Sequence, residues 1–344
     1  MRILLLIIGL ALTSLAWSDN TKVVNVYNWS GYIAPSIIQR FEQETGIHVN
    51  YATFDDNESL YAQLRANPET GYDVIFPSSY YVSKMRRAGM LQKINHQRLQ
   101  HYQQLRPNLL NKRYDPGQHY SIPYLWGTTG IIVNDRFIDP DSVSHWRDLW
   151  DARFRHKLLL LDDVKDAFAI ALLSMGESIN QHNPSNIYQA YHRLKKLLPN
   201  IKLFNSSTTI PIFIDEDAVI GTILNGDAFK AQQGNSHLHY IYPQEGVIMW
   251  IDCMAIPKQA PHKDNAYRFI NFLMRPQIAK LNSLKIGYST PNQKALKLMP
   301  PAIKENKTMN PPASILQRAQ LENNPGQAML QLMNHLWDRL KIAA

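Results

Sequence analysis

Acidic and aromatic side chains recur where apolar segments of this sequence end. The segment "GVIMWIDCMAIP" has the pattern of a buried strand, and alternation along it places Trp250, Asp252 and Met254 on one face. An ionised carboxylate among apolar neighbours is costly unless a positive charge meets it. We therefore expect Asp252 to be paired with Lys or Arg, protonated, or open to a bound cation. The nearby Trp250 favours a bound cation, because an indole face attracts ammonium groups.

Two other turns carry acids. In "LLLLDDVKDAF", an apolar strand runs into Asp162 and Asp163, and Asp166 falls in the first turn of the helix predicted to follow. Asp at the cap and Asp in the first turn both favour the positive end of a helix, and this alone could explain these residues. Three carboxylates within five residues exceed what a cap requires. Asp227 in "LNGDAF" opens another predicted helix and, taken alone, is expected to be a cap.

Aromatic residues occur in two further turns that follow predicted strands. "YNWSGY" contains Trp29 and Tyr32, and "FPSSYY" contains Tyr80 directly after Ser78 and Ser79, either of which could cap the next helix. In open α/β sheets, ligands bind beyond the carboxyl ends of strands. A methylene chain between ammonium groups needs ring faces along its length and carboxylates at its ends. The residue types therefore predict a site for an organic amine.

The elements that would position these residues alternate between short apolar strands and amphipathic helices, which is an α/β pattern. A helix is predicted over 36–45, with apolar residues at Ile37, Ile38 and Phe41, and Gly46 is placed to end it. Strand, helix and strand thus succeed one another in the first part of the chain.

Length, charge and the N-terminal segment limit the function classes. The chain has 344 residues and a net charge of +8, but its Lys and Arg are scattered among acids, so nucleic-acid binding is not expected. Residues 1–18 have an early Arg2, an apolar stretch and small residues, which predicts a cleaved secretory signal and no membrane insertion afterwards. A membrane anchor is the alternative, although the apolar stretch is shorter than the roughly 20 residues of a spanning helix. The single cysteine, Cys253, cannot form an intramolecular disulfide.

The motifs "YNWSGYI", "FPSSYYVSKMRRAGMLQKI", "YSIPYLWGTTGI", "LLLLDDVKDAF", "LNGDAF", "YPQEGVIMWIDCMAIP" and "IGYSTPN" follow in this order over nearly the whole mature chain. They resemble the periplasmic spermidine/putrescine-binding proteins of ABC importers. The resemblance implies an α/β, two-lobed periplasmic binding protein fold of type II, with a ligand cleft where the chain crosses near Gly127 and again near 250–252. The lobes implied are residues 19–127 plus 251–296 for lobe 1, and 128–250 plus 297–344 for lobe 2.

The same resemblance implies a periplasmic receptor that has no cofactor or metal, performs no chemistry and delivers its ligand to a membrane permease. Carried over position by position, it assigns ring walls, polar contacts and carboxylates to the ligand. These residues are Trp29, Ser30, Tyr32, Ser78, Tyr80, Asp163, Asp166, Asp227, Trp250, Asp252, Tyr288 and Glu322.

Several positions depart from the family pattern. Gly31 stands where an acid is usual, and Leu224 replaces a usual tryptophan. Asp166 stands where spermidine receptors have Glu, Glu322 where they have Gln, and Asp227 matches an acid of putrescine receptors. The departures leave the choice between spermidine and putrescine open.

The residues leave three other classes of protein open. A secreted hydrolase could use Asp163 and Asp252 as an acid–base pair, although no catalytic motif accompanies them. A metal-ion receptor could use His237 and His239, or the adjacent tyrosines that begin at Tyr80. A receptor of the same fold for another amine or small solute is the third alternative.

Overall fold

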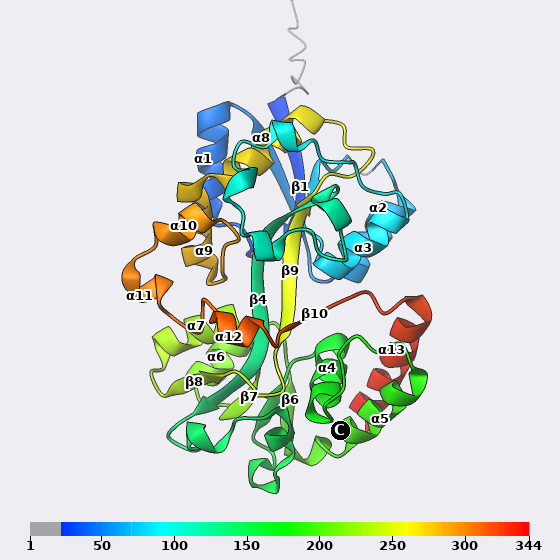
Figure 1. Ribbon diagram of the computed structural model, residues 1–344, viewed down its shortest axis with the longest axis vertical. Helices are drawn as coiled ribbons and strands as arrows, with labels where there is room; N and C mark the ends of the chain where they lie inside the picture. Colours follow the sequence, from blue (N-terminus) through cyan, green and yellow to red (C-terminus); the bar gives the residue numbers. More distant parts are fainter. Residues whose placement is uncertain (1–21, 70, 344) are drawn as a thin grey trace, which may run out of the picture.

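The protein has two lobes joined by two long strands, β4 (Ser121–Asn134) and β9 (Ile248–Ala255) (Figure 1). The computed structural model describes residues 22–69 and 71–343, so the signal predicted for residues 1–18 lies outside the described residues. The expected α/β, two-lobed architecture is confirmed. Within the described residues, no helix has the length and apolar character needed to cross a membrane.

The remaining elements of the described residues are short to medium in length. The other strands are β1 (Val23–Trp29), β2 (His48–Phe54), β3 (Val74–Ile75), β5 (Leu158–Leu160), β6 (Ile201–Phe204), β7 (Ile220–Leu224), β8 (Leu238–Ile241) and β10 (Gln320–Leu321). The helices are α1 (Pro35–Thr45), α2 (Asn57–Ala66), α3 (Ser79–Arg87), α4 (Val164–Ser174), α5 (Pro184–Lys195), α6 (Thr209–Ile214), α7 (Asn225–Gly234), α8 (Lys263–Met274), α9 (Pro276–Ile286), α10 (Gln293–Lys297), α11 (Pro301–Lys304), α12 (Ala313–Leu316) and α13 (Gln327–Ile342).

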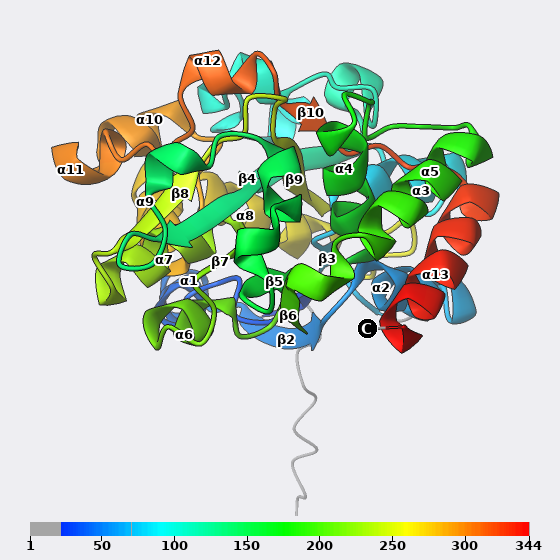
Figure 2. The same cartoon turned by 90° about the horizontal axis from the view of Figure 1, so that it is seen from below.

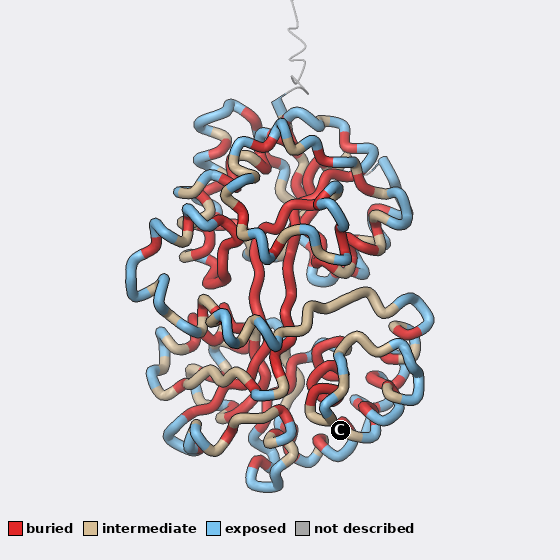
Figure 3. Tube along the Cα trace, in the orientation of Figure 1, coloured by how far each residue is buried: buried red, intermediate tan, exposed pale blue. Residues whose placement is uncertain are grey.

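The strands of the described residues form one mixed sheet that runs through both lobes, in the order β2-β1-β3-β9-β4-β7-β5-β6. β10 pairs with β9, and β8 pairs with β4. β4 and β9 are antiparallel, and their register places Gly127 opposite Trp250. Both strands are buried where they pass between the lobes (Figure 3).

Helices cover both faces of the sheet in each lobe (Figures 1 and 2). In the upper lobe of Figure 1, one core lies against α1, α8 and α9 and contains Trp250 and Met254, whereas the core against α2 and α3 contains Ile251 and Cys253. The alternation predicted along this strand is thus observed. In the lower lobe, α4, α5 and α13 lie on one side of the strands, and α6 and α7 on the other.

Helix α1 illustrates how the sequence sets these elements. It begins with a proline in its first turn and ends at Gly46, whose φ of 67° is left-handed and suits glycine. Its buried residues are Ile37 and Phe41, while Ile38 is half-buried. The predicted helix over 36–45 is confirmed with a shift of one residue at its start.

Candidate functional site

Asp252 lies in β9 at the junction of the lobes, with only 6% of its surface exposed. Its Oδ2 accepts a hydrogen bond from the Tyr32 hydroxyl at 2.7 Å, and its Oδ1 accepts one from Ser78 Oγ at 2.6 Å. No Lys, Arg or His of the described chain forms an ion pair with Asp252. The carboxylate is therefore held by two hydroxyl groups and has no cationic partner in the described part of the protein.

Burial raises the pKa of Asp252 to about 6, against the opposing effect of the hydrogen bonds from Ser78 and Tyr32. The charge of Glu322 raises it further. A carboxylate has about four acceptor positions, so two hydroxyl donors leave room for a further donor. An ammonium group at this point would offset the desolvation that raises the pKa.

Ser78 stands at the N-cap of α3, yet its side chain does not cap the helix. Its hydroxyl donates to Asp252 and accepts a hydrogen bond from Asn57 Nδ2 at 3.0 Å. The capping interpretation of this serine is wrong, because its hydroxyl oxygen accepts from the Asn57 side chain and not from a backbone N–H of the helix. Asn57 also donates to the Tyr80 hydroxyl at 3.1 Å. Sequence reasoning missed Asn57, which appears in the sequence only as part of a helix start.

Three of the expected rings lie together. Trp250 and Tyr288 meet edge to face with ring centroids 5.0 Å apart, and the Tyr32 and Tyr288 rings lie 6.0 Å apart. Trp250 Nε1 is buried without a hydrogen-bond partner in the described structure. These rings surround the face of β9 that carries Asp252.

The turn "YNWSGY" contributes fewer side chains to the surroundings of Asp252 than its residue types suggested. Trp29 is half-buried, and its Nε1 donates to the Phe76 carbonyl at 2.8 Å while its ring packs on Phe54. Ser30 is exposed. Gly31 is exposed too, with a left-handed φ of 66°. The structure thus brings Tyr32 to Asp252 and gives Trp29 structural partners.

The acids that follow β5 lie at the start of α4. Asp163 is the N-cap and accepts from the backbone N–H groups of Lys165 and Asp166 at 2.8 and 2.9 Å, so the capping interpretation is confirmed for it. Asp166 is buried and accepts from Thr129 Oγ1 at 3.2 Å. Burial and the charges of Asp163 and Glu322 hold the pKa of Asp166 well above its usual range. Neighbouring carboxylates at this end of the site therefore disfavour the ionised form of Asp166.

Asp227 lies in the first turn of α7, but its carboxylate accepts hydrogen bonds from side chains. The donors are the Tyr288 hydroxyl at 2.8 Å and Thr209 Oγ1 at 3.4 Å. Burial raises the pKa of Asp227. Tyr288 follows α9 in the upper lobe whereas α7 lies in the lower lobe, so this contact links the lobes (Figure 1).

Glu322 directly follows β10 and is paired with Lys165, whose Nζ lies 2.9 Å from Glu322 Oε1. The same Nζ lies 3.2 Å from the centre of the Tyr80 ring. Burial raises the pKa of Glu322, and the Lys165 charge opposes that rise. Lys165 is the single cation among three acids in "DDVKD", which is a signal that sequence reasoning could have used, but its role was not foreseen.

The residues considered for a metal site lie elsewhere. His237 Nδ1 and His239 Nε2 contact the two carboxylate oxygens of Asp135 at 2.6 and 2.8 Å, on an exposed part of the lower lobe. The described residues contain no group of three or more His, Cys, Asp or Glu that could hold a metal ion.

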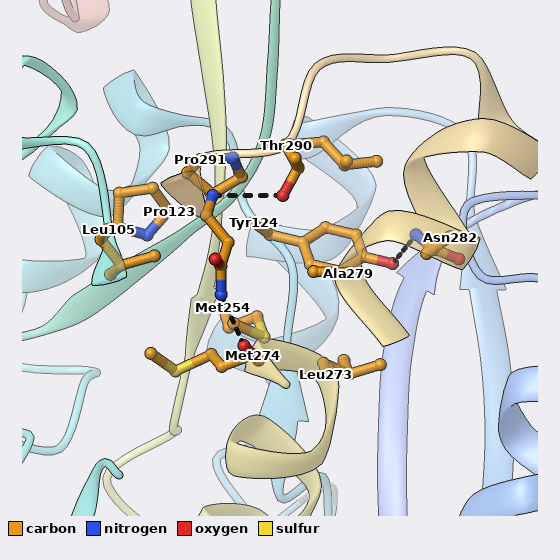
Figure 4. A pocket seen from close by; sticks show the side chains of 12 residues that line it. Leu105, Pro123, Tyr124, Met254, Leu273, Met274, Ala279, Asn282, Thr290 and Pro291 are labelled. Carbon is orange, nitrogen blue, oxygen red and sulfur yellow. Dashed lines mark hydrogen bonds between the residues drawn. The ribbon is translucent and has the colours of Figure 1, made fainter. Parts of the chain in front are cut away.

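An apolar pocket is lined by residues of β4, β9 and α9, among others (Figure 4). Leu105, Pro123 and Met254 are among the residues that line it, and none of its lining residues is acidic. Tyr124 also lines this pocket; its hydroxyl accepts from Asn282 at 2.7 Å and donates to the Tyr32 carbonyl at 2.8 Å. The pocket wall thus supports the backbone of Tyr32 and offers no partner for a cation.

Comparison with known proteins shows extensive similarity. Residues 36–311 match the model of the family described as bacterial extracellular solute-binding protein. The spermidine/putrescine-binding periplasmic protein of Escherichia coli (strain K12) is 42% identical over 92% of this chain and 90% of its own length. Spermidine/putrescine-binding periplasmic protein 1 of Haemophilus influenzae is 37% identical over 96% of this chain and 92% of its own length.

A solved structure agrees with these relatives. The putative spermidine/putrescine ABC transporter protein from Listeria monocytogenes superposes with a TM-score of 0.88 at 34% identity, covering 94% of this chain and 100% of that chain. The relatives are periplasmic solute-binding proteins, so this chain is a periplasmic solute receptor and not an enzyme. The chain belongs to the family of bacterial extracellular solute-binding proteins.

Proposed function

We propose that this receptor binds a polyamine, spermidine or putrescine, between its lobes and delivers it to the permease of an ABC importer. The observation that carries the proposal is Asp252, a buried carboxylate that has hydroxyl partners but no cationic partner among the described residues. Rings and further carboxylates surround it. The names of the relatives support the same class of ligand.

The geometry fits a flexible chain with a positive charge at each end. Asp252 and Asp227 are linked through aromatic side chains, because Tyr32 donates to Asp252, Tyr288 donates to Asp227, and the two rings are neighbours. Each ammonium over a ring contributes about 0.5 to 2 kcal/mol, and the carboxylates add charge-assisted hydrogen bonds. We propose as ligand contacts Trp29, Ser30, Tyr32, Ser78, Tyr80, Asp163, Asp166, Asp227, Trp250, Asp252, Tyr288 and Glu322.

Closure of the two lobes around the ligand would present one shape to the permease. Contacts that join the lobes support this idea: Tyr288 with Asp227, and Lys165 with the ring of Tyr80. We propose that residues 19–127 plus 251–296 move as one body and 128–250 plus 297–344 as the other. The antiparallel pair of β4 and β9 would be the hinge.

Calorimetry with putrescine and spermidine tests the proposal. We expect both amines to bind the wild type, and Asp252→Asn to weaken binding by about 2 to 5 kcal/mol, because one ammonium loses its charged partner. Asp264→Asn is the matched control, since it removes an exposed carboxylate on α8. Equal affinities for wild type and Asp252→Asn would show that Asp252 is not a ligand contact. A wild type that binds neither amine would overturn the proposed function.

A further inference from the structure

Lys165 carries a buried positive charge at the junction of the lobes. It lies in α4 of the lower lobe, and only 9% of its surface is exposed. Its Nζ is 2.9 Å from Glu322 Oε1 and 3.2 Å from the centre of the Tyr80 ring. Because Tyr80 belongs to α3 of the upper lobe, the side chain reaches from one lobe to the other.

The surroundings of this ammonium are those that a bound amine requires, namely a ring face and a carboxylate. Lys165 Nζ has no hydrogen-bond partner in the described structure, so its contact with Glu322 is an ion pair without a well-aligned hydrogen bond. Buried ion pairs that serve stability usually have their remaining donors satisfied. The pair therefore resembles an occupied ligand subsite more than an optimised structural bridge.

This subsite adjoins Asp252. The backbone N–H of Glu322 donates to the carbonyl of Met249, three residues before Asp252 in β9. Tyr80 is connected to Asp252 as well. Ser78 donates to Asp252, and Tyr80 lies two residues after Ser78, at the start of α3. The charge of Glu322 also raises the pKa of Asp252, after burial. Lys165 thus lies at the Glu322 end of the proposed amine site.

We propose that Lys165 determines specificity: its ammonium fills the subsite of Glu322 and Tyr80, so that the site prefers a diamine, and these two residues become ligand contacts only when a longer amine displaces Lys165. This inference rests on the proposed function, in which the site binds polyamines. The methylene stem and ammonium of Lys165 take the place of one aminoalkyl arm of a longer ligand. A third ammonium must displace Lys165 or lie beside a like charge, and both cost affinity.

The test compares the dissociation constants of putrescine and spermidine by calorimetry. Wild type should favour putrescine. Lys165→Met keeps an unbranched apolar stem and frees Glu322, so we expect the affinity ratio to shift toward spermidine by about tenfold or more. Lys165→Arg retains the cation and should keep the wild-type preference. If Lys165→Met does not fold, Lys165→Gln provides the same comparison.

Glu322→Gln in the Lys165→Met background is the matched control, because it removes the carboxylate that the third ammonium would meet. The shift toward spermidine should then disappear. A ratio that stays within about twofold of wild type in Lys165→Met, while both amines bind, would overturn the role of Lys165 and leave the proposed function intact. Absence of binding of either amine to the wild type would instead overturn the proposed function and this inference with it.

Discussion

Asp252 is deeply buried and hydrogen-bonded, and it has no cationic partner among residues 22–69 and 71–343, which has consequences in solution. Tyr32 and Ser78 fix the position of both carboxylate oxygens, so the charge is already oriented before a ligand arrives. Such preorganisation lowers the cost of ordering side chains on binding. The cost of desolvating the charge remains, and burial raises the pKa of Asp252 to about 6.

The affinity for amines should therefore depend on pH. Above about pH 6 Asp252 is ionised in the ligand-free protein and attracts an ammonium, whereas below this value a proton competes with the ligand. We expect the affinity to fall by up to about tenfold per pH unit below the pKa. Calorimetry at pH 7.5, 6.5, 5.5 and 4.5 measures this change. Asp252→Asn should have a flatter profile, and an equally steep profile in that variant would assign the dependence to other groups.

The ligand-free protein should gain stability when the charge of Asp252 is removed. The folded-state pKa is raised from 3.8 to about 6, so the ionised carboxylate destabilises the folded state above pH 6, and this cost disappears as the pH falls toward 4. We expect Asp252→Asn to raise the free energy of unfolding by about 1 to 3 kcal/mol at pH 7.5 and to change it little at pH 4. Urea unfolding of the ligand-free proteins measures both. A variant less stable than wild type at pH 7.5 would contradict this account.

Individual residues show where sequence reasoning reached its limit. Strand alternation correctly predicted that side chains of β9 face two sides in turn, and helix-start preferences correctly made Asp163 a cap. The same preferences were wrong for Ser78 and Asp227, whose side chains contact residues far away in the sequence. Local propensity contains no information about such contacts. Lys165 was missed for the same reason, since Glu322 and Tyr80 are distant in the chain.

Among the elements, the antiparallel pair of β4 and β9 joins the two lobes and carries part of the candidate site. Gly127 pairs with Trp250 in this ladder, and a Cβ at Gly127 would lie 2.5 Å from the Trp250 ring and 2.3 Å from Asn225 Oδ1. Asn225 Oδ1 accepts from the Thr128 backbone N–H at 3.0 Å. The absence of a side chain at residue 127 is therefore what allows the indole and α7 to approach β4.

Gly127→Ala should consequently reduce both stability and binding. We expect a loss of about 1 to 3 kcal/mol in the free energy of unfolding, because the added methyl group displaces the Trp250 ring, and an amine affinity at least about tenfold weaker. Gly176→Ala is the control: Gly176 has a left-handed φ of 77° and open space around it, so alanine strains only the local backbone. Thermal unfolding of both variants measures the effect on stability, and calorimetry measures the effect on amine affinity. Unchanged amine affinity in Gly127→Ala would show that the Trp250 ring position does not matter for the ligand.

The regular elements were largely predictable because their signals are local. The helix predicted over 36–45 and the strand predicted in 246–257 correspond to α1 and β9. The sheet order was not predictable from periodicity, since β9 pairs with β4, a strand more than one hundred residues earlier, and only the resemblance to a known family indicated the crossing. Pairing over such distances depends on the whole chain.

At the scale of the whole molecule, the two lobes enclose the site from opposite sides. Asp252 belongs to β9, which joins the lobes, Ser78 precedes α3 of the upper lobe, and Asp166 and Asp227 belong to α4 and α7 of the lower lobe (Figure 1). Neither lobe alone contains the full set of rings and carboxylates. A bound amine would therefore contact both lobes. Because it would bind the closed arrangement more tightly than the open one, it would stabilise the closed arrangement.

Mass spectrometry of the gently purified protein under non-denaturing conditions can show whether the ligand is an organic amine. We expect wild type to retain one unmodified diamine or triamine per chain, and Asp252→Asn purified in parallel to retain none. Retention of a metal ion, or of a solute without amino groups, by both proteins would contradict this expectation.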